Sequence, residues 1–107
     1  MNQLNMLDLI VREYIAIVEK LEHKNEVEKE RIVIEREDFK NMLERYAFAT
    51  FKYKTIVYKD LNFIIHDNES YTMPYKDKEL KKTVRKVIIN YRAYLTIKRL
   101  YNIPVNL

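Results

Sequence analysis

The chain has 107 residues, of which 48% are hydrophobic and 34% charged, and a formal net charge of +4. This composition predicts one globular domain, residues 1–107, and excludes a disordered chain. The absence of glycine excludes Gly-rich phosphate loops, dinucleotide fingerprints and nucleophile elbows, and the absence of cysteine excludes disulfides and thiolate chemistry.

Charge is distributed unevenly along the sequence. Residues 1–45 contain eight Lys and Arg against eleven Asp and Glu, whereas residues 46–107 contain twelve against five. This asymmetry predicts an electrostatically two-sided molecule, unless the halves neutralise each other across the fold.

Nothing in the sequence resembles a membrane or export signal. Residues 1–20 place charges on a helical pattern rather than a basic head before an apolar core, and no uncharged apolar run approaches the ~18 residues of a membrane span. Together with the missing cysteines, this leads us to expect a cytoplasmic protein without membrane contact.

The first half of the chain predicts a helix, a strand and a second helix. Residues 4–22 repeat apolar side chains at helical spacing, residues 31–35 alternate with β-branched side chains, and residues 37–49 return to helical spacing. The apolar arc of the first helix is broad, since it includes Leu4, Ile15 and Ile17, and this favours a homodimer formed through that helix.

The middle of the chain predicts a β-hairpin. Residues 50–58 and 61–66 alternate on either side of a polar turn, and residues 71–73 fit a third short strand stopped by Pro74. An alternative continues the second helix through Tyr58, because short apolar runs fit both periodicities.

Residues 78–102, "KELKKTVRKVIINYRAYLTIKRLYN", predict one long basic helix that begins at an Asp77 N-cap and ends at Asn102 and Pro104. The predicted order is α-β-α-β-β-α. We therefore expect a small single-domain α+β fold, an antiparallel hairpin or sheet packed by helices.

Candidate catalytic and metal-binding residues are scarce. His23 and His66 lie on different predicted turns, and Ser70 lies in a polar turn. A His–Asp pair such as His66–Asp67 is too small for a metal site, which needs three or four convergent ligands. We expect no enzyme activity, no metal and no cofactor.

The basic residues of the predicted last helix are the strongest functional signal. At 100° per residue, a single row beside the apolar stripe, ~30 Å long, contains Lys78, Lys81, Arg85, Arg92 and Arg99. Such a row could follow a nucleic-acid backbone, dock an acidic or nucleoprotein partner, or be a solvated or self-paired face.

The predicted hairpin offers a second basic and aromatic surface. Its candidate contacts are Lys52, Lys54, Tyr53 and Tyr58, and two later tyrosines, Tyr71 and Tyr75, are further candidate anchors for a partner.

The segment "RIVIEREDFKNMLERY", residues 31–46, resembles the strand-then-helix openings of small accessory proteins from phages, plasmids and conjugative elements of Gram-positive bacteria. Anti-CRISPR proteins are among them. The resemblance implies a non-enzymatic inhibitor or regulator that occupies a nucleic-acid-processing effector in the host cell. The alternatives are a direct nucleic-acid-binding protein and a homo-oligomeric interaction module.

Overall fold

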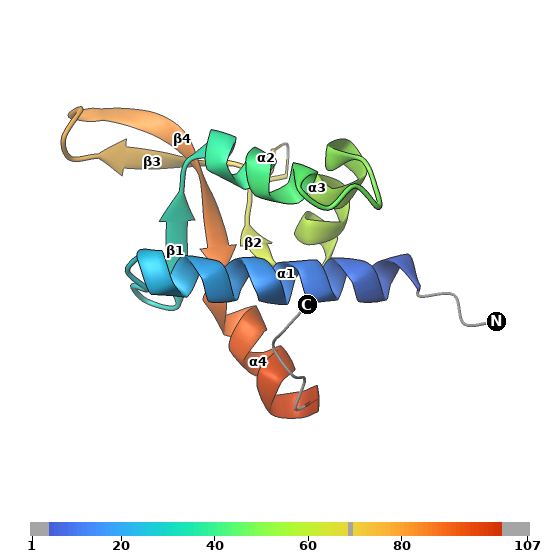
Figure 1. Ribbon diagram of the computed structural model, residues 1–107. Coiled ribbons are helices and arrows are strands. Elements are labelled where there is room, and N and C mark those ends of the chain that lie inside the picture. Colours follow the sequence, from blue (N-terminus) through green and yellow to red (C-terminus); the bar gives the residue numbers. More distant parts are fainter. Residues whose placement is uncertain (1–4, 69, 102–107) are drawn as a thin grey trace.

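The computed structural model describes residues 5–68 and 70–101, and Figure 1 shows their arrangement. In chain order the elements are α1 (Met6–Lys24), β1 (Arg31–Ile34), α2 (Arg36–Glu44), α3 (Phe51–Asp60), β2 (Ile64–Ile65), β3 (Met73–Asp77), β4 (Lys82–Asn90) and α4 (Tyr91–Tyr101). No helix among these residues is long and apolar enough to cross a bilayer.

Strand β4 organises the sheet, because all three other strands pair with it in antiparallel fashion. Its C-terminal half lies in the body of the domain between β1 and β2, and its N-terminal half pairs with β3. Figure 1 shows the β3–β4 ribbon projecting from the body, away from α1 and α4. We call residues 73–86 the ribbon.

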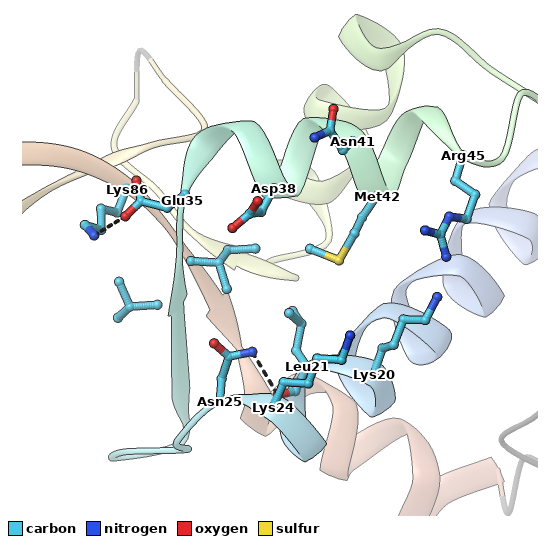
Figure 2. A pocket seen from close by; sticks show the side chains of 12 residues that line it. Lys20, Leu21, Lys24, Asn25, Glu35, Asp38, Asn41, Met42, Arg45 and Lys86 are labelled. Atoms are coloured by element: carbon cyan, nitrogen blue, oxygen red, sulfur yellow. Dashed lines mark hydrogen bonds and ion pairs between the residues drawn. The ribbon is translucent and has the colours of Figure 1, made fainter.

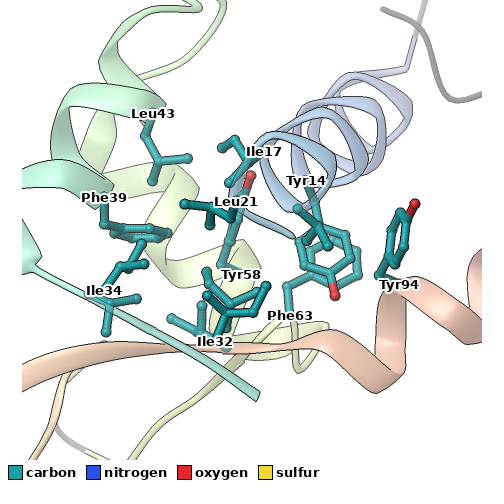
Figure 3. Packing of buried hydrophobic residues seen from close by; sticks show 14 of the residues in the cluster. Tyr14, Ile17, Leu21, Ile32, Ile34, Phe39, Leu43, Tyr58, Phe63 and Tyr94 are labelled. Carbon is teal, nitrogen blue, oxygen red and sulfur yellow. The ribbon is translucent and has the colours of Figure 1, made fainter. Parts of the chain in front are cut away.

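The core lies between the sheet and the helices. Ile32, Ile34, Val87 and Ile89 point from β1 and β4 into this core, where an aromatic cluster fills the centre. Figure 3 shows this packing, in which the rings of Tyr14 and Phe63 stack with centroids 3.9 Å apart.

The predicted fold class is confirmed: the protein is a small α+β domain with an antiparallel sheet. The first helix and first strand lie close to their predicted bounds, whereas the second helix, predicted over residues 37–49, ends at Glu44. The predicted helix end at Asn102 and Pro104 lies outside the described residues.

The strand predicted over residues 50–58 is wrong, because this segment forms α3. Thr50 caps the helix by accepting a hydrogen bond from the Tyr53 backbone N–H. The alternative prediction, a second helix that continues through Tyr58, gave the correct helical conformation for this segment. However, α3 is a separate helix that follows a break after α2. Lys54 and Tyr58 are buried four residues apart, so a lysine lies on the inner face of the helix, where periodicity alone would not place a charge.

The long basic helix predicted over residues 78–102 is also wrong. Residues 78–81 form a hairpin turn, residues 82–90 form β4, and only α4 is helical. Asp77 does accept backbone hydrogen bonds from Glu79 and Leu80, as an N-cap would. The chain then reverses at Lys81, which has a φ of 54°, and the β-branched run that follows enters the centre of the sheet.

The third predicted strand continues beyond Pro74, contrary to expectation. Pro74 lies inside β3 and pairs with Arg85. Since β3 pairs only with β4, it is an edge strand, and proline is tolerated there when the side that lacks an N–H faces outward.

A buried ion pair joins three helices. The Lys54 ammonium is 0% exposed and lies 2.5 Å from Glu13 of α1. It also donates to the backbone oxygens of Leu43, at 2.7 Å, and Tyr46, at and beyond the end of α2. Tyr58 donates to the second Glu13 oxygen at 2.9 Å. Burial raises the pKa of Glu13, and the hydrogen bonds from Lys54 and Tyr58 oppose that rise.

Two tyrosines hold α4 against α1. The Tyr94 hydroxyl donates to Glu19 at 2.9 Å, and the Tyr91 hydroxyl donates to Glu22. With α4 on one side and α2 and α3 on another, Ile15 and Ile17 are buried within a single chain. The chain itself therefore covers this part of the apolar arc of α1, whereas Met6 and Leu7 at the start of the helix are 36% and 45% exposed and Leu4 lies outside the described residues. A homodimer through this helix stays a prediction.

We expect Lys54→Met to lower the free energy of unfolding by about 3–5 kcal/mol, because it leaves Glu13 as a buried acid without its cation. Urea titration followed by circular dichroism measures the change. Lys52→Met, on the exposed side of the same helix, is the control and should change stability by less than about 0.5 kcal/mol. Equal effects of the two substitutions would contradict this role for the ion pair.

We also expect stability to fall at alkaline pH through Tyr91. The hydrogen bond to Glu22, followed by burial, raises the pKa of Tyr91 to about 12. Its pKa in the unfolded chain is about 10. The fold thus favours the neutral phenol. The stabilising contribution of the protonated Tyr91 to the free energy of unfolding is therefore complete below pH ~10 and is lost as the pH rises toward 12. In unfolding titrations, the stability advantage of the native chain over Tyr91→Phe should shrink across this window. An advantage that stays constant from pH 8 to 12 would refute the assignment.

Candidate binding surface

The five predicted row residues do not lie on one helix. Lys78 and Lys81 lie in the hairpin turn and Arg85 on β4, whereas Arg92 and Arg99 lie on α4. The structure therefore replaces the ~30 Å row by two separate sets of cations, one on the ribbon and one on α4.

The predicted hairpin surface is divided in the same way. Lys54 and Tyr58 are fully buried, so neither can touch a partner of the folded domain, because Lys54 is used in the ion pair and Tyr58 in the core. Lys52 and Tyr53 are exposed on α3. Tyr71 is half-buried and packs against the rings of Phe39 and Phe51.

Two cations at the base of the ribbon are held in place by the protein itself. Arg85 donates to the Thr72 hydroxyl and carbonyl, each at 2.7 Å, and to the Asp67 carboxylate at 2.9 Å. Lys86 pairs with Glu35 and lies 3.8 Å from Asp77. The hydrogen bond to Glu35 is the main cause that raises the pKa of Lys86. Both side chains thus fix the ribbon to the body.

The outer part of the ribbon carries cations of a different kind. Four exposed lysines there form no ion pair with any acid that the structure describes: Lys76, Lys78, Lys81 and Lys82. The one exposed acid among them is Glu79. The Asp77 carboxylate accepts hydrogen bonds from the backbone N–H groups of Leu80 and Glu79, which lower the pKa of Asp77. This carboxylate therefore stabilises the turn.

Sequence reasoning found Lys78 and Lys81 but missed Lys76 and Lys82. Lys76 lies on β3 before the turn of residues 78–81, and Lys82 lies on β4 after it. A hairpin interpretation of that turn would have placed them on neighbouring strands. The misassigned helix concealed this, because helical geometry put Lys82 on another face.

The α4 cations are less concentrated. The Arg92 side chain is 79% exposed and its nitrogen is 4.0 Å from Glu30. The Lys98 ammonium lies 5.3 Å from the centre of the Tyr94 ring. Arg99 is exposed near the end of the described chain. At this separation the Arg92–Glu30 pair contributes little, so α4 presents scattered charge rather than a formed site.

A groove of about 550 Å³ opens between the end of α1, β1 and α2 (Figure 2). Its apolar floor includes Leu21 and Met42, with Lys20, Lys24 and Arg45 toward one end and Glu35 and Asp38 toward the other. Lys20, Lys24 and Arg45 lie at the C-terminal ends of α1 and α2, where the helix dipole stabilises positive charge without any ligand. Lys86, which is paired with Glu35, is the fourth cation in the lining, against the two acids. The lining contains no histidine, serine or cysteine.

The loop of His66, Asp67 and Ser70 is used structurally. The two His66 ring nitrogens lie 2.8 Å from the Asp67 carbonyl and 3.1 Å from that of Lys59. The Asp67 carboxylate accepts the Ser70 backbone N–H at 2.8 Å as well as the Arg85 hydrogen bond. Within the described residues, no three His, Asp or Glu side chains converge to hold a metal ion.

Comparison with known proteins adds no family: no protein-family model matches the chain, and no curated protein matches it either. The arrangement of charge and exposed side chains is therefore the basis for assigning a function.

Proposed function

We propose that this chain is a non-enzymatic binding protein of the cytoplasm that attaches to nucleic acid through its ribbon. The observation that supports the proposal most directly is the group of four lysines without acidic partners, Lys76, Lys78, Lys81 and Lys82, on an element that projects from the body.

Unpaired ammonium groups on a projecting element suit a polyanion. Each lysine that contacts a phosphate releases condensed counterions, so several together bind a nucleic-acid backbone without reading its sequence. The two strands of the ribbon are each about 17 Å long at ~3.4 Å per residue, enough to pass several nucleotides. The ion pairs of Arg85 with Asp67 and of Lys86 with Glu35 hold the ribbon in a fixed direction. This reduces the conformational entropy that is lost on binding.

The resemblance to small mobile-element proteins supports a narrower form of this proposal. The nucleic acid would be that of a nucleic-acid-processing effector, such as a nuclease with its bound guide or target. By occupying that nucleic acid, the protein would act as an inhibitor or regulator, as anti-CRISPR proteins do.

A second contact, with the protein part of an effector, is favoured by an apolar patch on α3. Tyr53 is 46% and Ile56 45% exposed, and these side chains lie three residues apart on one side of the helix. Exposed tyrosine beside an aliphatic side chain is typical of protein–protein anchors. Together, the ribbon and the α3 patch would let the chain bind a nucleoprotein at two points.

Replacing Lys78 and Lys82 together by glutamine should weaken nucleic-acid binding and its dependence on salt. If both contact phosphates, the slope of log affinity against log salt should fall by about 1.4 for a single strand and about 1.8 for a duplex. Fluorescence anisotropy of labelled oligonucleotides between about 50 and about 200 mM salt measures the slope.

The matched control removes the same charge from two exposed lysines on the helices, Lys40→Gln with Lys52→Gln. This variant should keep nearly the native slope. If the control and ribbon variants lose affinity equally, the interaction depends on net charge alone and the ribbon is not the contact surface.

The protein contact predicts a different response. In a pull-down from a Gram-positive lysate treated with nuclease, Tyr53→Ala should retain less of a specific protein than the native chain, because the anchor is lost while the ribbon is intact. Tyr75→Ala, on the ribbon, is the control and should retain the native amount. Undiminished retention by a folded Tyr53→Ala would remove the α3 patch as an anchor.

A further inference from the structure

The face of the sheet opposite the core carries its own apolar row, which becomes accessible toward the ribbon. Side chains alternate along β4, so Val87 and Ile89 point into the core while Val84, Lys86 and Ile88 point to the other side. Their cross-strand partners share that side, which we call the open face.

Six apolar side chains follow one another along the open face: Val33, Ile65, Ile88, Met73, Val84 and Tyr75. None belongs to the core cluster formed by the described residues. Ile88 is 7% exposed, whereas Tyr75, opposite Val84 on the ribbon, is 37% exposed. The row thus begins in the body and ends on the ribbon at an accessible aromatic ring.

The open face carries three cations, Arg31, Lys82 and Lys86, and the acids Glu35 and Asp77 lie beside Lys86. The remaining charge is positive, because Arg31 and Lys82 are exposed and form no ion pair with any acid that the structure describes. The Lys86 ammonium lies 5.6 Å from the centre of the Tyr75 ring. A second copy packed on this face by two-fold symmetry would bring further unpaired cations to an apolar contact, which is unfavourable. A chain of phosphates with flat, apolar bases is complementary to both features.

We infer that the open face binds single-stranded nucleic acid, with a base stacked at Tyr75 and Val84 and the backbone beside Lys82. This inference rests on the proposed function and adds that the nucleic acid is single-stranded and that its bases, rather than its phosphates alone, are contacted. A duplex hides the faces of its bases in the stack, so only a single strand can use an exposed ring beside cations in this way.

The chain contains no tryptophan, so a single introduced indole reports on one place. In Tyr75→Trp, titration with a short oligothymidylate should quench the indole emission at the same concentrations at which anisotropy reports binding. Leu95→Trp places the indole on α4 at similar exposure, 36% against 37% for Tyr75, and should show no quenching. In addition, Tyr75→Ala should weaken single-strand binding about 5- to 150-fold, as the loss of one stacked base predicts, while Leu95→Ala leaves it unchanged.

Each contrary outcome has a distinct meaning. Binding that depends on Lys78 and Lys82 but leaves the indole emission of Tyr75→Trp unchanged would overturn the stacking inference and preserve the proposed function. Equal or tighter binding of a duplex would also overturn it. Indole emission of the Tyr75→Trp variant that shifts with protein concentration alone, together with a dimer in sedimentation, would assign the open face to a second copy. If no oligonucleotide binds at all, both the inference and the proposed function fail.

Discussion

The fold depends on placing one lysine ammonium in the interior. A buried ammonium has three donors to satisfy, and here Lys54 meets Glu13 of α1 and the backbone oxygens of Leu43 and Tyr46. This one side chain therefore holds α3 against α1 and also satisfies backbone carbonyls at the end of α2. Tyr58, one turn further along α3, donates to the same carboxylate and packs with the central rings. Among the described residues, no buried side-chain nitrogen or oxygen lacks a hydrogen-bond partner, so the interior tolerates this charge because its network is complete.

Strand β4 connects this core to the proposed contact surface. Its last residues are among the most buried in the domain, and its first residues are exposed on the ribbon. One continuous strand therefore connects the ribbon directly to the centre of the sheet. Arg85 and Lys86 lie at the transition, where their ion pairs with Asp67 and Glu35 hold the ribbon against the body. A contact surface held in this way loses little freedom on binding.

The distribution of charge separates structural cations from available ones. Lys54, Arg85 and Lys86 are each bound to an acid, and each joins two parts of the chain. The lysines toward the tip of the ribbon have no such partner among the described residues, and the exposed Tyr75 lies on the same ribbon. The acidic first half and the basic second half therefore neutralise each other in part, at Lys54–Glu13 and Lys86–Glu35, and the remaining positive charge gathers on one projecting element.

The sequence by itself determined the class of the domain and the elements α1, β1 and α2, because their periodicity and side-chain types act over neighbouring residues. It also indicated Lys78, Lys81 and Tyr75 as candidate contact residues, and all three are exposed. Tertiary structure decided α3 and β4. Residues 50–58 alternate like a strand, yet they form a helix because Glu13, far away in sequence, supplies the partner that lets Lys54 be buried. Residues 82–90 fit a basic helix, yet they form the central strand because three other strands pair with them. Long-range pairing and the compensation of a buried charge have no counterpart in local periodicity, so only the folded chain could reveal them.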